Sequence, residues 1–101
     1  MSRRDELALM DYLEHIHQAV TRIQSYLIGL DRAAFLASEE KQDAVIRNLE
    51  VIGEAAGNIQ RHFPGFAEQH PDIPLRAAYG TRNALAHGLL QGRSGYRLED
   101  R

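Results

Sequence analysis

Apolar residues recur every three or four positions along most of the chain, which is the spacing of amphipathic α-helices. The first such series predicts a long helix over residues 4–27. Ser2 or Asp5 can cap its start, and Gly29 can end it. The apolar positions of this series should face the core: Leu7, Met10, Leu13, Ile16 or His17, Val20, Ile23, Leu27 and Leu30.

A second helix is predicted over residues 39–62, with Ser38 as its N-cap. Between the two helices, "LDRAAFLAS" reads as a short connector whose Phe35 and Leu36 point at the core. Small residues interrupt the second helix, so another helix can approach it closely there: Gly53, Ala55, Ala56 and Gly57. The remaining core positions of this helix should be Ala44 or Val45, Leu49, Ile52 and Ile59.

Pro64 should stop the second helix, because proline lacks the N–H that a helix interior requires. A proline-rich linker follows, with a short helical turn over residues 65–69. Pro74 suits the first turn of a third helix over residues 75–89. The pattern therefore predicts an all-α, up-down helical bundle over residues 1–90, followed by an irregular or disordered tail over residues 91–101.

Composition narrows the class of protein. The 101 residues, 44% of them hydrophobic, suit one small domain that a partner chain would help to stabilise. The chain has no cysteine, starts too polar for a signal peptide, and has no apolar run of the roughly 20 residues that span a membrane. We therefore expect a cytoplasmic protein. Its net charge of −2 argues against a generally basic DNA-binding surface, so phosphate binding would need a local cluster.

One such cluster lies in "YGTRNALAHGLLQG", where Arg82, Asn83 and His87 stand within six residues. Asn83 and His87 are four residues apart and would share a helix face. Arginine can hold a phosphate, histidine can transfer a proton near neutral pH, and asparagine can orient either group. This chemistry suits RNA cleavage. Spacing alone, however, favours a structural interpretation, in which the histidine caps the last carbonyls of a helix whose arginine and asparagine are solvated.

Three motifs occur in order along the chain: "RNLEVIGEAAGNI", "HPDIPL" and "GTRNALAHG". Together they resemble the HEPN-domain toxins of the HepT type, over about residues 5–88. The resemblance implies a bundle of four or five helices that forms a homodimer, with R-x4-H motifs facing each other across a cleft. It implies metal-independent cleavage of RNA, without a cofactor, and a minimal-nucleotidyltransferase antitoxin as the partner.

By position, the resemblance makes Arg82 and His87 the catalytic pair and Asn83 a supporting polar residue. Glu54, in "IGEAA", falls where the family often has an acidic group and is a second supporting candidate. The family motif continues to a tyrosine that the antitoxin is thought to modify with AMP. Leu89 occupies that position, so we expect no modification there.

Other readings stay open from the sequence. The alternative function is a non-catalytic, HEPN-like binding module that pairs with a nucleotidyltransferase or binds a nucleotide. Glu50 and Glu54 are four residues apart and could pair locally with Arg47. His15 and His17 are only two residues apart on a helix and make a poor metal pair, so no metal site is expected.

Overall fold

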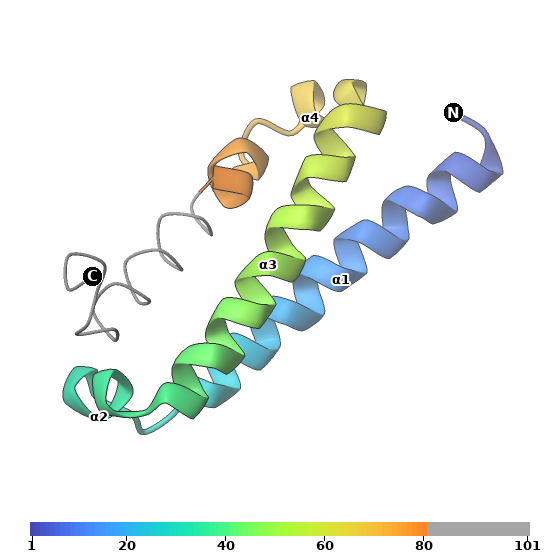
Figure 1. Ribbon diagram of the computed structural model, residues 1–101. Coiled ribbons are helices and arrows are strands. Elements are labelled where there is room, and N and C mark those ends of the chain that lie inside the picture. Colours follow the sequence, from blue (N-terminus) through green and yellow to red (C-terminus); the bar gives the residue numbers. More distant parts are fainter. Residues whose placement is uncertain (81–101) are drawn as a thin grey trace, which may run out of the picture.

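The computed structural model of the chain describes residues 1–80, and every regular element in this range is helical (Figure 1). The all-α fold class is therefore confirmed. Residues 75–80 are also helical, so the third predicted helix begins where expected. Its remainder and the predicted tail lie outside the described residues. The four complete helices are α1 (Arg3–Leu27), α2 (Arg32–Ala37), α3 (Glu39–His62) and α4 (Pro64–Gln69).

The two long helices, α1 and α3, lie side by side and run in opposite directions (Figure 1). Both begin at side-chain caps that the sequence indicated. Ser2 accepts a hydrogen bond from the backbone N–H of Asp5, whose carboxylate accepts one in return from Ser2 N–H. Ser38 accepts from the N–H of Lys41 at the start of α3. Each cap satisfies donors that the first turn of a helix leaves unpaired.

The connector between the long helices is itself a helix, α2, which the sequence analysis missed. Asp31 caps it by accepting a 2.8 Å hydrogen bond from Ala34 N–H. The buried amide of Gln42 on α3 donates to the carbonyls of Phe35 and Leu36 at 3.0 and 2.9 Å. Leu36 is 52% exposed, so its predicted place in the core is wrong. These two hydrogen bonds from Gln42 tie α2 to α3.

The buried side of α1 also differs from the prediction. Leu9 and Ala19 are its buried residues, whereas Leu7, Met10 and Val20 of the predicted stripe are exposed. The sequence carries two overlapping apolar series on this helix, and periodicity alone does not separate them. Ala19 is completely buried, which indicates that close approach to α3 selected the face with the smaller side chain.

The core lies where α1, α3, α4 and the segment before residue 75 meet. Ile59 is completely buried, and the ring of Phe63 packs edge-on against Tyr12 of α1 with 6.4 Å between ring centroids. Phe63 caps the C-terminus of α3, so this helix ends before Pro64 as predicted, and the predicted short turn is α4, which begins one residue earlier, at Pro64. The buried core cluster comprises Leu9, Ala56, Ile59, Phe63 and Leu75.

The small residues of α3 serve close packing, as predicted: Gly53, Ala55, Ala56 and Gly57 are all buried. At Gly57, a Cβ atom would lie 3.0 Å from two ring atoms of Tyr79. This contact brings the helical segment 75–80 against α3. None of the described helices combines the length and apolar character needed to cross a membrane.

Candidate functional site

Of the residues predicted to carry the chemistry, Glu54 lies within the described part of the chain. The pair Arg82 and His87, the supporting Asn83 and the departure at Leu89 lie outside the described residues. Glu54 stands in the middle of α3 and its side chain is exposed. Among residues 1–80, the candidate site is therefore the surface around the Glu54 carboxylate.

Glu54 belongs to a row of polar residues on one side of α3. They recur at steps of three and four, so they share one face of the helix. All are exposed except the partly buried Asn58. We call this row the α3 polar face: Arg47, Glu50, Glu54, Asn58 and Arg61.

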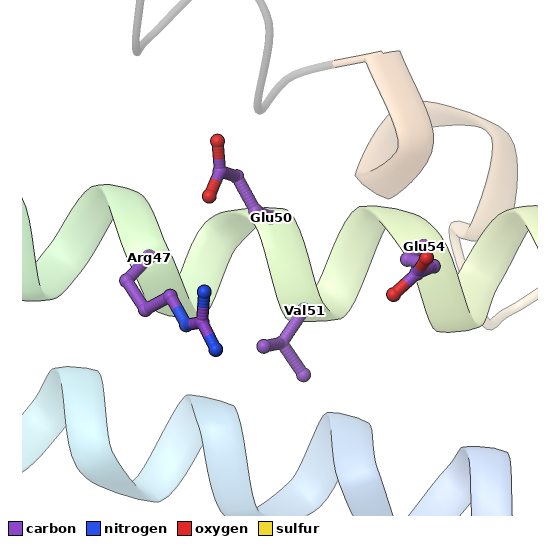
Figure 2. Close-up of a pocket in the computed structure, with 4 residues that line it drawn as sticks. All are labelled: Arg47, Glu50, Val51 and Glu54. Atoms are coloured by element: carbon purple, nitrogen blue, oxygen red, sulfur yellow. The ribbon is translucent and has the colours of Figure 1, made fainter.

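A hollow of about 330 Å³ lies along the α3 polar face (Figure 2). Arg47, Glu50, Val51 and Glu54 line it. Figure 2 shows Arg47 and Val51 extending toward α1, whereas Glu50 extends away from α1 at the other edge of the polar face. Within residues 1–80, the hollow thus lies along the side of α3 where Arg47, Glu50 and Glu54 are exposed.

A smaller hollow of about 60 Å³ adjoins the first between α1 and α3. Glu54 and Val51 line both hollows. The smaller one adds the exposed His15 and the ring of Tyr12 from α1. The described residues that line it are Tyr12, His15, Val51, Glu54, Ala55 and Asn58. The carboxylate of Glu54 therefore lies where both long helices present polar groups.

The charge of the larger hollow decides what it can bind. Among the described residues, two carboxylates and one guanidinium line it, so residues 1–80 contribute a net negative charge to it. No ion pair joins Arg47 to Glu50 or Glu54 in the described part of the chain, so the local pairing that the sequence allowed does not form. The two carboxylates that residues 1–80 place here favour cationic groups and hydrogen-bond donors over phosphate.

The C-terminal end of α3 has the opposite character. Arg61 and His62 occupy the last turn of the helix. The guanidinium of Arg61 donates from Nη2 to Oδ1 of Asn58 at 3.1 Å, and Asn58 donates from Nδ2 to the carbonyl of Glu54 at 3.0 Å. The sequence analysis did not single out Arg61 or Asn58, although their spacing of three residues on a helix was a usable signal.

Histidine, aspartate and glutamate are the side chains that could bind a metal ion in this chain, which has no cysteine. Among residues 1–80, no group of three or more histidine, aspartate or glutamate side chains is arranged to hold a metal ion. His15 and His17 are both exposed on α1. His15 instead borders the smaller hollow with Glu54, a neighbour that the sequence pattern did not indicate.

Known proteins similar to this chain point to one family. The description "Ribonuclease HepT-like" applies to the family that matches residues 16–90. "Probable ribonuclease HepT" of Thermococcus cleftensis is 40% identical over 77 residues, which cover 76% of this chain and 67% of that protein. MJ1380 of Methanocaldococcus jannaschii, whose name assigns it provisionally to the RNases, is 35% identical over 88 residues, covering 86% of this chain and 74% of that protein.

A second protein of the same archaeon, MJ0127, is 40% identical over 88 residues that cover 86% of this chain and 67% of its own length. No solved structure matches the chain at a significant level. The family match spans three quarters of the sequence, from the middle of α1 past the "GTRNALAHG" motif. The chain therefore belongs to the HepT-like ribonuclease family.

Proposed function

We propose that this protein is a metal-independent endoribonuclease that acts as the toxin of a toxin–antitoxin pair. The observation that carries the proposal is the family match over residues 16–90, which includes the complete Arg82-to-His87 motif in the sequence. The names of the relatives support the same activity class, because each of the three relatives above is named for a ribonuclease.

In the proposed reaction, the 2′-oxygen of a ribose attacks the neighbouring phosphorus and the 5′-oxygen leaves, which yields a 2′,3′-cyclic phosphate. One proton leaves the 2′-hydroxyl and one joins the 5′-oxygen. His87 is proposed to transfer protons, because an imidazole changes charge near neutral pH. Arg82 is proposed to hold the phosphate and the charge that develops on it. Asn83 would hold the imidazole tautomer or bind the phosphate.

A homodimer is part of the proposal. In a two-fold dimer, the same surface of each protomer meets its counterpart, so two motifs would face one cleft. Two copies of His87 would then be available, one to accept the 2′-hydroxyl proton and one to donate to the 5′-oxygen. The predicted partner is a minimal-nucleotidyltransferase antitoxin that binds this assembly.

The carboxylates of the larger hollow support a limited role for Glu54. The Glu54 carboxylate in its lining disfavours direct contact with phosphate and favours a guanidinium or an imidazolium. We therefore propose that Glu54 supports the site by holding a cationic catalytic group, and that Glu54→Gln lowers the cleavage rate more than it lowers RNA affinity.

The test is cleavage of single-stranded RNA by purified protein in EDTA, with His87→Ala prepared in parallel. The variant should cleave at least about 100-fold more slowly, because general acid–base catalysis contributes roughly 10²–10⁴-fold. His17→Ala is the matched control, since His17 is exposed on α1 away from both hollows. Equal cleavage by His87→Ala and the wild type would refute the assignment of the site.

The same purified protein distinguishes the alternative function, a non-catalytic binding module, from the proposed ribonuclease. A binding module without catalysis would pair tightly with a nucleotidyltransferase, and His87→Ala would not change that pairing. The wild type would then leave RNA intact at every enzyme concentration. Size-exclusion chromatography with light scattering tests the dimer, and a monomer that still cleaves RNA would contradict the shared cleft.

A further inference from the structure

An exposed aromatic ring and a guanidinium meet at one point on the surface of α3. Ring atoms Cδ1 and Cε1 of Tyr79 both lie 3.0 Å from the position that a Cβ would take at Gly57, and Nη1 of Arg61 lies 3.3 Å from it. The ring and the guanidinium are therefore neighbours above the same glycine. Despite this contact, 44% of Tyr79 remains exposed.

Packing explains only part of this arrangement. Phe63 and Leu75 close the core next to Tyr79 with exposed fractions of 9% and 4%. Tyr79 is absent from the residues that pack against the core cluster, although its neighbour Ala78 is among them. A tyrosine kept for core packing would bury more of its ring. Much of the Tyr79 side chain is instead available to a ligand.

The guanidinium beside the ring is held in place. Asn58 accepts a hydrogen bond from Arg61 at 3.1 Å and is itself tied to the backbone carbonyl of Glu54 at 3.0 Å. This chain of hydrogen bonds limits the motion of Arg61, so less conformational entropy is lost when Arg61 binds a further group. A guanidinium carries five N–H donors, and one hydrogen bond to Asn58 leaves others for a phosphate.

We propose that Tyr79, Arg61 and Asn58 form a nucleotide-binding ledge, in which Tyr79 stacks on an unpaired RNA base and Arg61 binds the adjacent phosphate. The proposal rests on the proposed ribonuclease function. Aromatic rings that stack on bases, next to arginine, are the common means of binding single-stranded RNA. Tyr79 precedes Arg82 by three residues in the sequence, so the bound nucleotide would flank the cleavage position.

The surrounding charges favour this end of α3 for RNA. Arg76 is exposed and stands three residues before Tyr79 on the same helical segment, so it adds positive charge on the same side. His62 lies next to Arg61 in the last turn of α3. Glu54 lies about two turns before Arg61 on α3, where its carboxylate repels phosphate. The ledge thus binds the RNA backbone at the Arg61 end of the helix.

The experiment measures binding of a fluorescent 2′-O-methyl oligoribonucleotide, which lacks the attacking hydroxyl, to the full chain. A set of such strands carries one abasic nucleotide at each position in turn. In the wild type, one abasic position should weaken binding by about 5- to 150-fold, the loss expected for one stacked base. Tyr79→Leu should bind the intact strand more weakly than the wild type by the same factor. An abasic nucleotide at that position should then cause no further loss of affinity.

Matched variants separate stacking and charge from general effects. Tyr79→Phe should bind within about twofold of the wild type, because it keeps the ring. Arg61→Gln should reduce by about one the slope of log affinity against log salt, because one phosphate contact is lost. Tyr26→Leu and Arg22→Gln are controls on α1 and should change neither quantity. Thermal unfolding monitored by circular dichroism checks that each variant is folded.

The outcomes are distinct from those of the cleavage test. The inference is overturned if Tyr79→Leu binds like the wild type, or if the losses from Tyr79→Leu and from every abasic position simply add. If Tyr79→Leu does not fold, the wild type alone still tests the inference. Binding that no single abasic position weakens would then overturn it. Cleavage that depends on His87 with no effect of Tyr79 defeats the ledge alone. A Tyr79-dependent abasic position without any cleavage supports the ledge and defeats the proposed function.

Discussion

The contact between Gly57 and Tyr79 allows a quantitative test of how residues 75–80 pack on α3. Gly57→Ala adds one methyl group whose carbon would lie 3.0 Å from Cδ1 and Cε1 of Tyr79. Carbon atoms in favourable contact are about 3.5–4.0 Å apart, so the ring must move outward by roughly half an ångström or more. Overpacking of this kind typically costs about 1–3 kcal/mol.

An opposing term favours the same substitution. Gly57 lies inside α3, and among the described glycines a positive φ occurs at Gly29 and not at Gly57. Alanine stabilises a helix interior by about 1 kcal/mol relative to glycine. Gly57→Ala should therefore change the free energy of unfolding by between zero and about −2 kcal/mol. When Tyr79 is first replaced by alanine, the clash is gone and the same substitution should stabilise by about 1 kcal/mol.

The assay is urea unfolding, followed by circular dichroism, of the wild type, Gly57→Ala, Tyr79→Ala and the double variant at one protein concentration. The two substitutions should show a coupling energy of about 1–3 kcal/mol. Gly65→Ala is the control, because no atom lies within 4 Å of its new Cβ, and it should behave alike in both backgrounds. A stabilisation by Gly57→Ala of about 1 kcal/mol in both backgrounds would refute the contact.

Three further predictions concern the core, a turn and regulation. Ile59 is completely buried, so Ile59→Ala should lower the free energy of unfolding by about 2–5 kcal/mol and Ile59→Val by about 0.5–1.5 kcal/mol, both measured in urea; equal losses would contradict this. Gly29 has φ 71°, so Gly29→Ala should lower the melting temperature, at a cost of about 1 kcal/mol, and Gly29→Asn should cost less. With a minimal nucleotidyltransferase and ATP, mass spectrometry should find no added AMP, because Leu89 replaces the tyrosine; an adduct would refute this.

The long helices could be read from the sequence because their signals are local. Ser2 and Ser38 cap the two helices within three residues of their partners, and Pro64 stops α3. The buried face of α1 could not be read in the same way. The buried face is the side of α1 that contacts α3, and the sequence has two overlapping apolar series, either of which could form that side. The helix α2 was missed because a buried glutamine holds it across six to seven residues.

In the candidate site too, features set by local sequence could be predicted, whereas contacts between helices could not. The spacing of four residues places Glu50 and Glu54 on one face of α3, and the structure shows both as exposed. The roles of Arg82 and His87 were assigned from resemblance and remain predictions. The meeting of Tyr79 with Gly57 joins residues from two helices across the linker, so no local pattern could reveal it. The sequence shows a glycine in one helix and a tyrosine in another, but it does not show that the two are in contact.

The order of charges along α3 limits how RNA can lie on this protein. The centre of the α3 polar face carries Glu50 and Glu54, which no ion pair neutralises within residues 1–80, whereas its C-terminal end carries the hydrogen-bonded Arg61. A phosphate placed over the centre would meet two carboxylates, so the RNA backbone should cross the helix at the Arg61 end. Glu54 is then close to the RNA without contacting its phosphates, which is the position of a group that acts through a cation. The ledge and the proposed supporting carboxylate are therefore complementary parts of one surface, because the repulsion at one end directs the backbone to the other.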